Sequence, residues 1–228
     1  MERPGFKLNY KIKRQLYSGR TKFQKIDIFD LEVFGKVLFL DNDFQICESD
    51  TVIYDKAMVD PIFEMNKDAK RVMILGGGDG GVLREVLTHP VEEAIMVELD
   101  KEVVDICKQY LPDICKNAFK DNRTKLIIDD AGKVIKQERN LDAIISDLTD
   151  PEKMLEFGGV EFYEQLFLDI KNALADNGIL TLQVGSHYEH EMVHMIETML
   201  KKHFKEVSFR PVFIPSYVEP WIFGYARK

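Results

Sequence analysis

A carboxylate set among glycines is the feature of this sequence that points most directly to chemistry. Residues 71–81 read Arg-Val-Met-Ile-Leu-Gly-Gly-Gly-Asp-Gly-Gly, an apolar run that flows into a G-x-G-x-x-G pattern at Gly76, Gly78 and Gly81. A buried strand that ends in glycines and opens a helix begins a nucleotide-binding α/β unit. Such loops often face an anion, which Asp79 would repel. Asp79 therefore indicates that the ligand end over the loop is cationic.

Two further acids follow the next two apolar segments. Glu98 ends the segment 94–98, 17 residues beyond Gly81. In a unit of this kind the acid accepts hydrogen bonds from a ribose diol, because a carboxylate takes two hydroxyl donors side by side. Asp130 precedes Ala131 and is suited to accept from an adenine amino group, or to cap a helix, and both roles can coexist. The alternatives are a solvated strand end for Glu98 and a tight turn without ligand for the glycines.

A fourth acid, Asp147, follows the apolar segment 142–146. Ligands of open α/β sheets bind outside the carboxyl ends of the strands, so Asp79, Glu98, Asp130 and Asp147 are expected to converge on one crevice. Four acids around one nucleoside would be unfavourable for an anionic ligand. They suit a ligand that carries a sulfonium and an amine.

The elements that must position these acids alternate from residue 70 onward. This alternation predicts a Rossmann-like, mostly parallel sheet covered by helices on both faces. Residues 1–59 are expected to form a small N-terminal β-strand domain, and residues 60–228 the catalytic domain. The expected strands are 23–29, 31–40, 43–47, 71–75, 94–98, 124–128, 142–146, 178–184, 205–213 and 221–226. The expected helices are 80–88, 101–110, 131–137, 160–174 and 188–203. Residues 152–159 are expected to form a surface loop able to close over the site.

Composition excludes several classes of protein. The net charge of -8 argues against nucleic acid as a partner. No apolar run reaches the roughly 18 residues that span a bilayer. The basic segment 1–14 lacks the apolar core of a signal peptide. The three cysteines, Cys47, Cys107 and Cys115, form no C-x-x-C pair, which favours a reduced, cytoplasmic protein.

An ordered set of motifs resembles the polyamine aminopropyltransferases, the spermidine and spermine synthases. The resemblance runs from about Tyr17 to the C-terminus. Its motifs are Gln24, Gly-Lys-Val-Leu-Phe-Leu-Asp at 35–41, Gln45, Glu-Ser-Asp at 48–50, the glycine run at 76–81, Val-Glu-Leu-Asp at 97–100, Asp130-Ala131, and Asp-Leu-Thr-Asp-Pro at 147–151. That family moves an aminopropyl group from decarboxylated S-adenosylmethionine to an amine and releases methylthioadenosine.

The resemblance implies a role for each matched position. Gln24, Glu98, Asp130 and Ala131 would hold the nucleoside, with Gly76 and Gly78 beneath it. Asp79 would bind the amino group of the donor and disfavour intact S-adenosylmethionine, whose α-carboxylate it repels. Asp147 would position and deprotonate the attacking amine, whose free pKa near 10.4 otherwise keeps it protonated. Decarboxylated S-adenosylmethionine is thus a co-substrate, and no other cofactor or metal is expected.

The acceptor is suggested by two departures from spermidine synthases. Their Asp-Glu-Phe-x-Tyr-His-Glu stretch is here Asp-Thr-Val-Ile-Tyr-Asp-Lys at 50–56, which keeps Tyr54 but alters the usual diamine pocket. The segment Pro-Ser-Tyr-Val-Glu-Pro-Trp at 215–221 resembles spermine synthases and contains Tyr217. Glu219 would then be the additional acid for a longer acceptor, with Asp150 a further contact. Spermidine, giving spermine, is the expected acceptor; putrescine and a thermospermine product are the alternatives.

Two other functions remain open. A methyltransferase of the same class I fold would use intact S-adenosylmethionine, and it commonly has an acid before the glycines, where this chain has Leu75. A non-catalytic paralogue would bind a polyamine or nucleoside as a sensor, although retention of Asp147 argues against it. His187, His190 and His194 have helical spacing but are interpreted as a solvated helix face. Members of the family usually form dimers, so a homodimer is expected, although little sequence precedes Tyr17.

Overall fold

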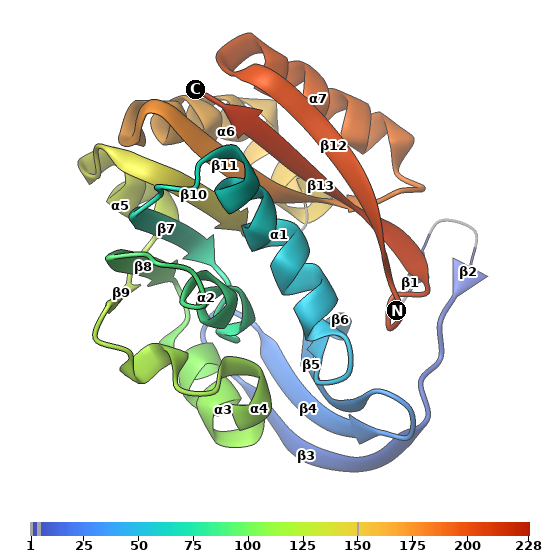
Figure 1. The fold of residues 1–228 in the computed structure, drawn as a ribbon. Coiled ribbons are helices and arrows are strands. Elements are labelled where there is room, and N and C mark those ends of the chain that lie inside the picture. Colours follow the sequence, from blue (N-terminus) through green and yellow to red (C-terminus); the bar gives the residue numbers. More distant parts are fainter. Residues whose placement is uncertain (1, 4–5, 150) are drawn as a thin grey trace.

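The computed structural model describes residues 2–3, 6–149 and 151–228, and the side chains of residues 7–149 and 158–228. Its centre is a seven-stranded sheet in the order β12-β13-β11-β10-β7-β8-β9 (Figure 1). The strands are β7 (Arg71–Gly76), β8 (Glu93–Glu98), β9 (Thr124–Ile128), β10 (Leu141–Asp147), β11 (Leu174–Ser186), β12 (Lys205–Ile214) and β13 (Glu219–Arg227). All neighbours pair in parallel except β13, which is antiparallel to both β11 and β12. The predicted mostly parallel sheet is confirmed.

Alternation along the strands produces two apolar layers. In β7, Val72 and Ile74 belong to the core cluster that contains α1 (Thr51–Met65) and α2 (Gly81–Val86). Met73 and Leu75 belong to the cluster on the other face, with α6 (Pro151–Ala173) and α7 (His190–His203). Figure 1 shows these helix pairs on opposite sides of the sheet. Every second side chain of a strand faces the same layer, which explains why the central strands are apolar throughout.

The N-terminal region forms a separate four-stranded antiparallel sheet. Its strands are β3 (Ile12–Arg20), β4 (Lys25–Leu31), β5 (Gly35–Leu40) and β6 (Asp43–Cys47), in that order. Buried side chains of this sheet pack against α3 (Lys101–Tyr110) and α4 (Pro112–Cys115) in a third apolar cluster. A short pair, β1 (Glu2–Arg3) with β2 (Phe6–Lys7), precedes it. The proposed domain boundary at 59/60 falls within α1, which connects the two sheets.

Several elements differ from the sequence-based expectation. β3, α1 and α4 were not predicted; α1 has no strong amphipathic pattern because residues around it are buried by both α2 and the sheet. Residues 131–137 divide into α5 (Ala131–Val134) and a 3-10 turn (Ile135–Gln137), and a second 3-10 turn lies at Ala118–Lys120. The loop expected at 152–159 is wrong: these residues are helical within α6, which is interrupted at Gly159, where φ is 69°.

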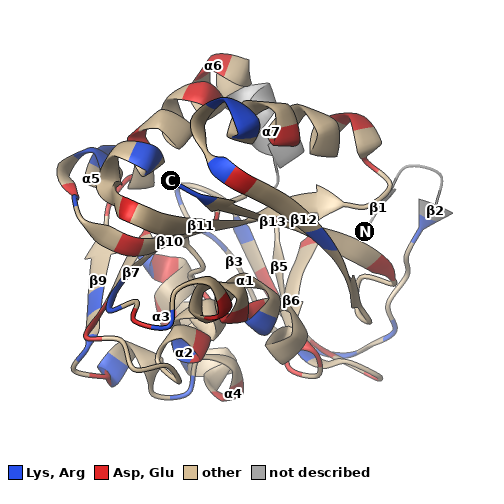
Figure 2. Ribbon diagram, turned by 45° about the horizontal axis from the view of Figure 1, so that its top comes forward, with Lys and Arg blue, Asp and Glu red and all other residues tan. Residues whose placement is uncertain are grey.

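Charged residues of both signs are interspersed along the helices, whereas the central strands carry few (Figure 2). No helix in the described parts of the chain combines the length and hydropathy needed to cross a membrane.

Candidate active site

A cavity of about 670 Å³ lies at the carboxyl ends of β7, β8 and β10, next to the N-terminal sheet. This is the edge at which ligands of open α/β sheets bind. Polar residues from many separate segments line it: Gln24 and Gln45, Tyr54, Asp79, Glu98 with Asp100, Asp130, Asp147, and Gln183. Apolar and aromatic residues complete it, among them Phe44, Leu148, Phe162, Tyr217 and Trp221. The four acids expected in one crevice therefore do share one cavity.

Glycine is required in the loop at 76–81 because other residues approach its backbone closely. Gly76 has φ 84° and Gly80 has φ 81°, a region that L side chains rarely adopt. A Cβ at Gly76 would lie 2.2 Å from the backbone oxygen of Asp147, and a Cβ at Gly78 would lie 2.8 Å from a carboxylate oxygen of Glu98. The glycines thus let this loop pack directly against two of the cavity acids.

Glu98 and Gln24 meet at Asp100. The Glu98 carboxylate accepts from the backbone N–H of Asp100 at 2.9 Å, and burial raises its pKa. Asp100 caps α3 by accepting from Glu102 N, and it also accepts from Thr21 Oγ1 at 2.7 Å. Gln24 Nε2 donates to the same Asp100 carboxylate at 3.4 Å. This network fixes the N-terminal sheet against the end of β8.

Asp130 performs the capping role that its position allowed. It precedes α5, and its carboxylate accepts from the Lys133 backbone N–H at 3.2 Å. The side chain is exposed and, with Ala131 and Gly132, lines the cavity. The capping bond uses Oδ1, so capping and ligand binding are compatible here.

Asp79 lies at the turn between β7 and α2. Its Oδ1 accepts from the Gly81 backbone N–H at 2.8 Å. Burial raises its pKa to about 6, while that backbone hydrogen bond and the charge of Arg84 oppose the shift. The carboxyl is therefore largely ionised at neutral pH and would be stabilised further by a cation.

Asp147 is the last residue of β10, and its carboxylate is held by a tyrosine from helix α1. Tyr54, on α1, donates its hydroxyl to Asp147 Oδ1 at 2.7 Å. The Tyr54 ring packs edge-on against Phe223 with centroids 5.1 Å apart, which orients it. The pairing of Asp147 with Gly76 in adjacent parallel strands brings this carboxylate beside the glycine loop. Asp79 and Asp147 thus both line the cavity, Asp147 beside the glycine loop that contains Asp79.

Residues that the sequence did not single out form the wall beyond Asp147. Trp221 Nε1 donates to Gln183 Oε1 at 3.1 Å, and Gln183 Nε2 donates to the backbone oxygen of Leu148 at 2.9 Å. Gln183 lies near the carboxyl end of β11, and that position was the available signal. Trp221 ends the motif at 215–221, but no role was assigned to it from the sequence.

The expected acceptor residues divide into three outcomes. Tyr217 lines the cavity and donates its hydroxyl to the backbone oxygen of Gln45 at 2.5 Å. Glu219 is fully buried, shares a short hydrogen bond with Ser186 Oγ, and is not among the described residues that line the cavity. Asp150 lies outside the described residues.

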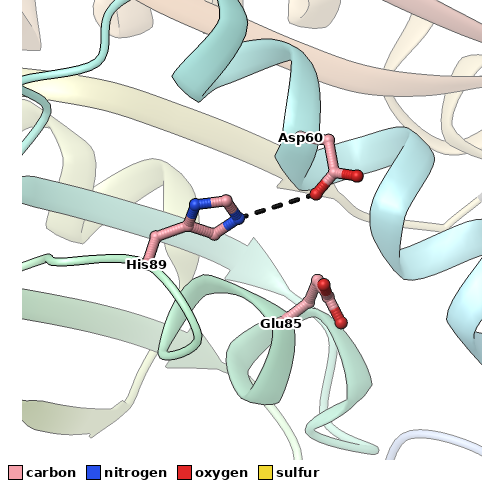
Figure 3. Close-up of side chains that lie close together, drawn as sticks. All are labelled: Asp60, Glu85 and His89. Atoms are coloured by element: carbon pink, nitrogen blue, oxygen red, sulfur yellow. Dashed lines mark ion pairs between the residues drawn. The ribbon is translucent and has the colours of Figure 1, made fainter.

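One group with metal-ligand chemistry occurs elsewhere, on the outer side of α1 and α2. Asp60, Glu85 and His89 have ligand atoms within 4.8 Å of one another, and this is the one such group found in the described part of the chain (Figure 3). His89 Nε2 lies 3.5 Å from Asp60 Oδ1. Lys56 Nζ lies 3.7 Å from both Asp60 and Glu85. A cation is thus already provided by the chain itself.

Comparisons with known proteins agree with this geometry. A family model described as the spermine/spermidine synthase domain matches residues 51–228, and a spermidine synthase tetramerisation domain matches residues 1–48. Polyamine aminopropyltransferases of Thermococcus onnurineus and Pyrococcus abyssi are 36% and 37% identical to this chain. The alignments cover 96% of the chain in both cases and 77% and 80% of those relatives.

Solved structures give the same result. A spermidine synthase in complex with the transition state analogue AdoDATO superposes with a TM-score of 0.85 at 29% identity, covering 96% of this chain and 74% of that one. The spermidine synthase of Thermotoga maritima matches with the same TM-score and coverage at 28% identity. With one family model over most of its length, relatives more than 30% identical and a shared fold, the chain belongs to the spermine/spermidine synthase family.

Proposed function

We propose that this chain transfers the aminopropyl group of decarboxylated S-adenosylmethionine to a polyamine and releases methylthioadenosine. The observation that carries the proposal is that Asp79 and Asp147 line the same cavity as Glu98 and Asp130, the acids suited to a nucleoside. A donor that joins a nucleoside to a sulfonium and an ammonium suits a cavity lined by these four acids. The relatives titled polyamine aminopropyltransferase support the same assignment.

Donor binding is assigned to the glycine-loop end. Glu98 would accept from the ribose hydroxyls, Asp130 from the adenine amino group, and Gln24 would contact the nucleoside from the N-terminal sheet. Asp79 would pair with the donor ammonium. The same carboxylate would repel the α-carboxylate of intact S-adenosylmethionine, so one residue gives affinity and discrimination together.

The transfer step is assigned to Asp147. An alkylammonium must lose a proton before its nitrogen can attack carbon, and a carboxylate within hydrogen-bond distance can orient the amine and accept that proton. Tyr54 holds the carboxylate in place through its hydroxyl. The nitrogen then forms a bond to the aminopropyl carbon as the carbon–sulfur bond breaks, and methylthioadenosine leaves. Alignment of these atoms supplies much of the rate, because the sulfonium is already a good leaving group.

The acceptor is the finer part of the proposal. We propose spermidine as the acceptor and spermine as the product. The residues that support this choice are Tyr217 and Trp221, which line the cavity, rather than the buried Glu219. Aromatic faces attract an ammonium within about 6 Å of the ring centre, and they also contact methylene groups. A triamine offers an additional ammonium for such a wall. Putrescine is the competing acceptor, since the solved relatives are titled spermidine synthases.

Assembly and location complete the proposal. The match of residues 1–48 to a tetramerisation domain supports a homo-oligomer, and a dimer is the smallest form consistent with it. Light scattering after size exclusion distinguishes dimer from tetramer. The three cysteines are buried and free, which suits a reducing cytoplasm.

A single assay tests the activity. Purified protein is incubated with decarboxylated S-adenosylmethionine, with and without putrescine or spermidine, and methylthioadenosine and polyamine products are separated by chromatography. Amine-dependent release of methylthioadenosine is expected. Donor binding without release would favour the sensor, and methyl transfer from intact S-adenosylmethionine would favour the methyltransferase. Resolution of spermine from thermospermine identifies which nitrogen reacts.

A further inference from the structure

A buried ion pair lies directly behind the glycine loop, outside the cavity. Asp55 follows Tyr54 on α1 and is completely buried. Its Oδ2 accepts from Arg84 Nη2 at 2.5 Å and from Thr51 Oγ1 at 2.8 Å. Arg84, on α2, also donates to the backbone oxygen of Ile114 at 2.8 Å. Asp55 Oδ1 is buried and accepts no hydrogen bond from the residues that the structure describes. The pair has no place in the transfer chemistry described above.

The pair is adjacent to Asp79. A Cβ at Gly81 would lie 2.8 and 2.9 Å from the two carboxylate oxygens of Asp55 and 3.0 Å from Asp79 Oδ1, so the two carboxylates face each other across this glycine. The Asp79 charge acts on the ionisation of Asp55, and the Arg84 charge acts on the ionisation of both carboxyl groups. Burial and the Asp79 and Asp147 charges raise the pKa of Asp55, which Arg84 opposes, and Arg84 also lowers the pKa of Asp79.

We propose that Asp55 and Arg84 are positioning residues that set donor selectivity, an inference that rests on the proposed function. By pairing with Arg84, Asp55 prevents that cation from pairing with Asp79. The Asp79 carboxylate then stays available to a donor ammonium and repulsive to a donor carboxylate. Without Asp55, Arg84 would partly neutralise Asp79 and would attract the α-carboxylate of intact S-adenosylmethionine.

The charges on the outer side of the pair do not replace Asp55. Glu85 Oε2 lies 3.8 Å from Arg84 Nη2, beyond hydrogen-bond distance. Lys56 Nζ lies 3.7 Å from a carboxylate oxygen of Glu85 and 3.7 Å from one of Asp60. Glu85 and Asp60 already lie near Lys56, so Asp55 is the acid that pairs most closely with Arg84. Asp55 therefore determines how strongly the Arg84 charge acts on groups in the cavity.

The test compares two ligands rather than one. Dissociation constants for decarboxylated and intact S-adenosylmethionine are measured by calorimetry at pH 8 for the unmodified protein, Asp55→Asn and Asp55→Asn/Arg84→Gln. The preference for the decarboxylated donor should fall by about tenfold or more in the single variant, since a charge this close shifts a carboxylate's equilibria by about one pKa unit or more. The double variant removes both charges and should recover the preference. Asp60→Asn, on the same helix, is the matched control and should retain it.

Each outcome separates the possibilities. If Asp55 had only a structural role, Asp55→Asn would weaken the binding of both ligands equally. An unchanged preference in folded Asp55→Asn overturns the inference. A double variant that stays unselective also overturns it. If Asp55→Asn does not fold, Thr51→Val removes the hydroxyl that also orients Asp55 and should lower the preference about twofold or more; no change there counts against the inference. Absence of any preference in the unmodified protein would instead contradict the proposed function.

Discussion

The proposed donor and acceptor ends of the cavity are constructed differently. At the donor end, Gly76, Glu98 and Asp130 each lie at or just after the end of a parallel strand, so consecutive β–α units deliver them to one edge. At the acceptor end, Tyr54 comes from a helix, Gln45 from the N-terminal sheet, and the wall residues Gln183 and Trp221 from β11 and β13. The parallel sheet alone places the donor-end residues together. The acceptor-end residues are placed by contacts between segments that are far apart in the sequence.

This difference teaches where specificity can change without loss of the fold. Replacing a donor-end glycine forces a clash with backbone, as the 2.2 Å approach at Gly76 shows. Acceptor-end side chains such as Gln183 and Trp221 instead contact each other and a loop oxygen through their side-chain polar groups. Substitutions at the acceptor end should therefore alter substrate choice more readily than they alter stability.

The largest effect is expected where the two ends join. Asp147→Asn keeps the shape of the side chain but removes the proton acceptor, so the transfer rate should fall roughly 10²–10⁴-fold, the usual range for a lost general base. Donor affinity should change little, because Asp147 belongs to the acceptor. Single-turnover kinetics and calorimetry measure the two quantities. Near-normal turnover would assign the proton to water or another acid.

The donor end is tested at Asp79. Asp79→Asn should weaken decarboxylated S-adenosylmethionine roughly 10- to 100-fold, the range for hydrogen bonds to charged groups. In the unmodified protein the pKa of Asp79 is about 6. Because the donor cation requires the ionised carboxylate, affinity should be full above that pH and should decline as pH falls through it, by up to about tenfold per unit. Calorimetry across pH 5–8 should show this slope for the unmodified protein and lose it in the variant. A slope that persists would assign the titration to another group.

The acceptor end is tested by a pair of variants. Trp221→Leu should raise KM for spermidine about 3- to 30-fold, as for a partly desolvated cation–π contact, and should affect putrescine less. Glu219→Gln should have nearly equal effects on both amines if its buried position is retained in the complex. Steady-state kinetics with both acceptors provide the comparison. A selective loss for spermidine in Glu219→Gln would restore Glu219 as an acceptor residue, and a higher kcat/KM for putrescine in the unmodified enzyme would overturn the acceptor proposal.

The smallest effect concerns the contact that holds the acceptor end together. Buried Asp50 accepts from the Ser216 backbone N–H at 2.7 Å and from Ser216 Oγ at 3.2 Å. Ser216→Ala removes only the second bond, so the free energy of unfolding should fall by about 1 kcal/mol, or about 2–4 °C in Tm for a chain of this size. Calorimetric melting checks this. A larger loss would mean that the loop around Ser216 is displaced.

What the sequence could predict follows the same division. The strand ends with Asp79, Glu98 and Asp147 were predictable because a parallel sheet brings them to one edge whatever the remaining contacts are. Trp221 and Gln183 could not be assigned, because their place depends on β13 pairing with β11. Glu219, only two residues before Trp221, matched a family motif yet lies buried against Ser186. The helix α1 was missed because its apolar residues contact both a helix and a sheet, which removes the one-sided pattern.

The order of strands also has a consequence for how the protein is made. β13 ends the described chain, yet it lies inside the sheet, between β11 and β12. Translation delivers β13 after both of its neighbours, so β11 and β12 cannot pair through it until residues 219–227 emerge. A nascent chain can assemble the donor end early, but the acceptor wall with Trp221 must wait. Premature termination near residue 218 should therefore yield a nucleoside-binding, aggregation-prone fragment with an exposed strand edge rather than a weakened enzyme.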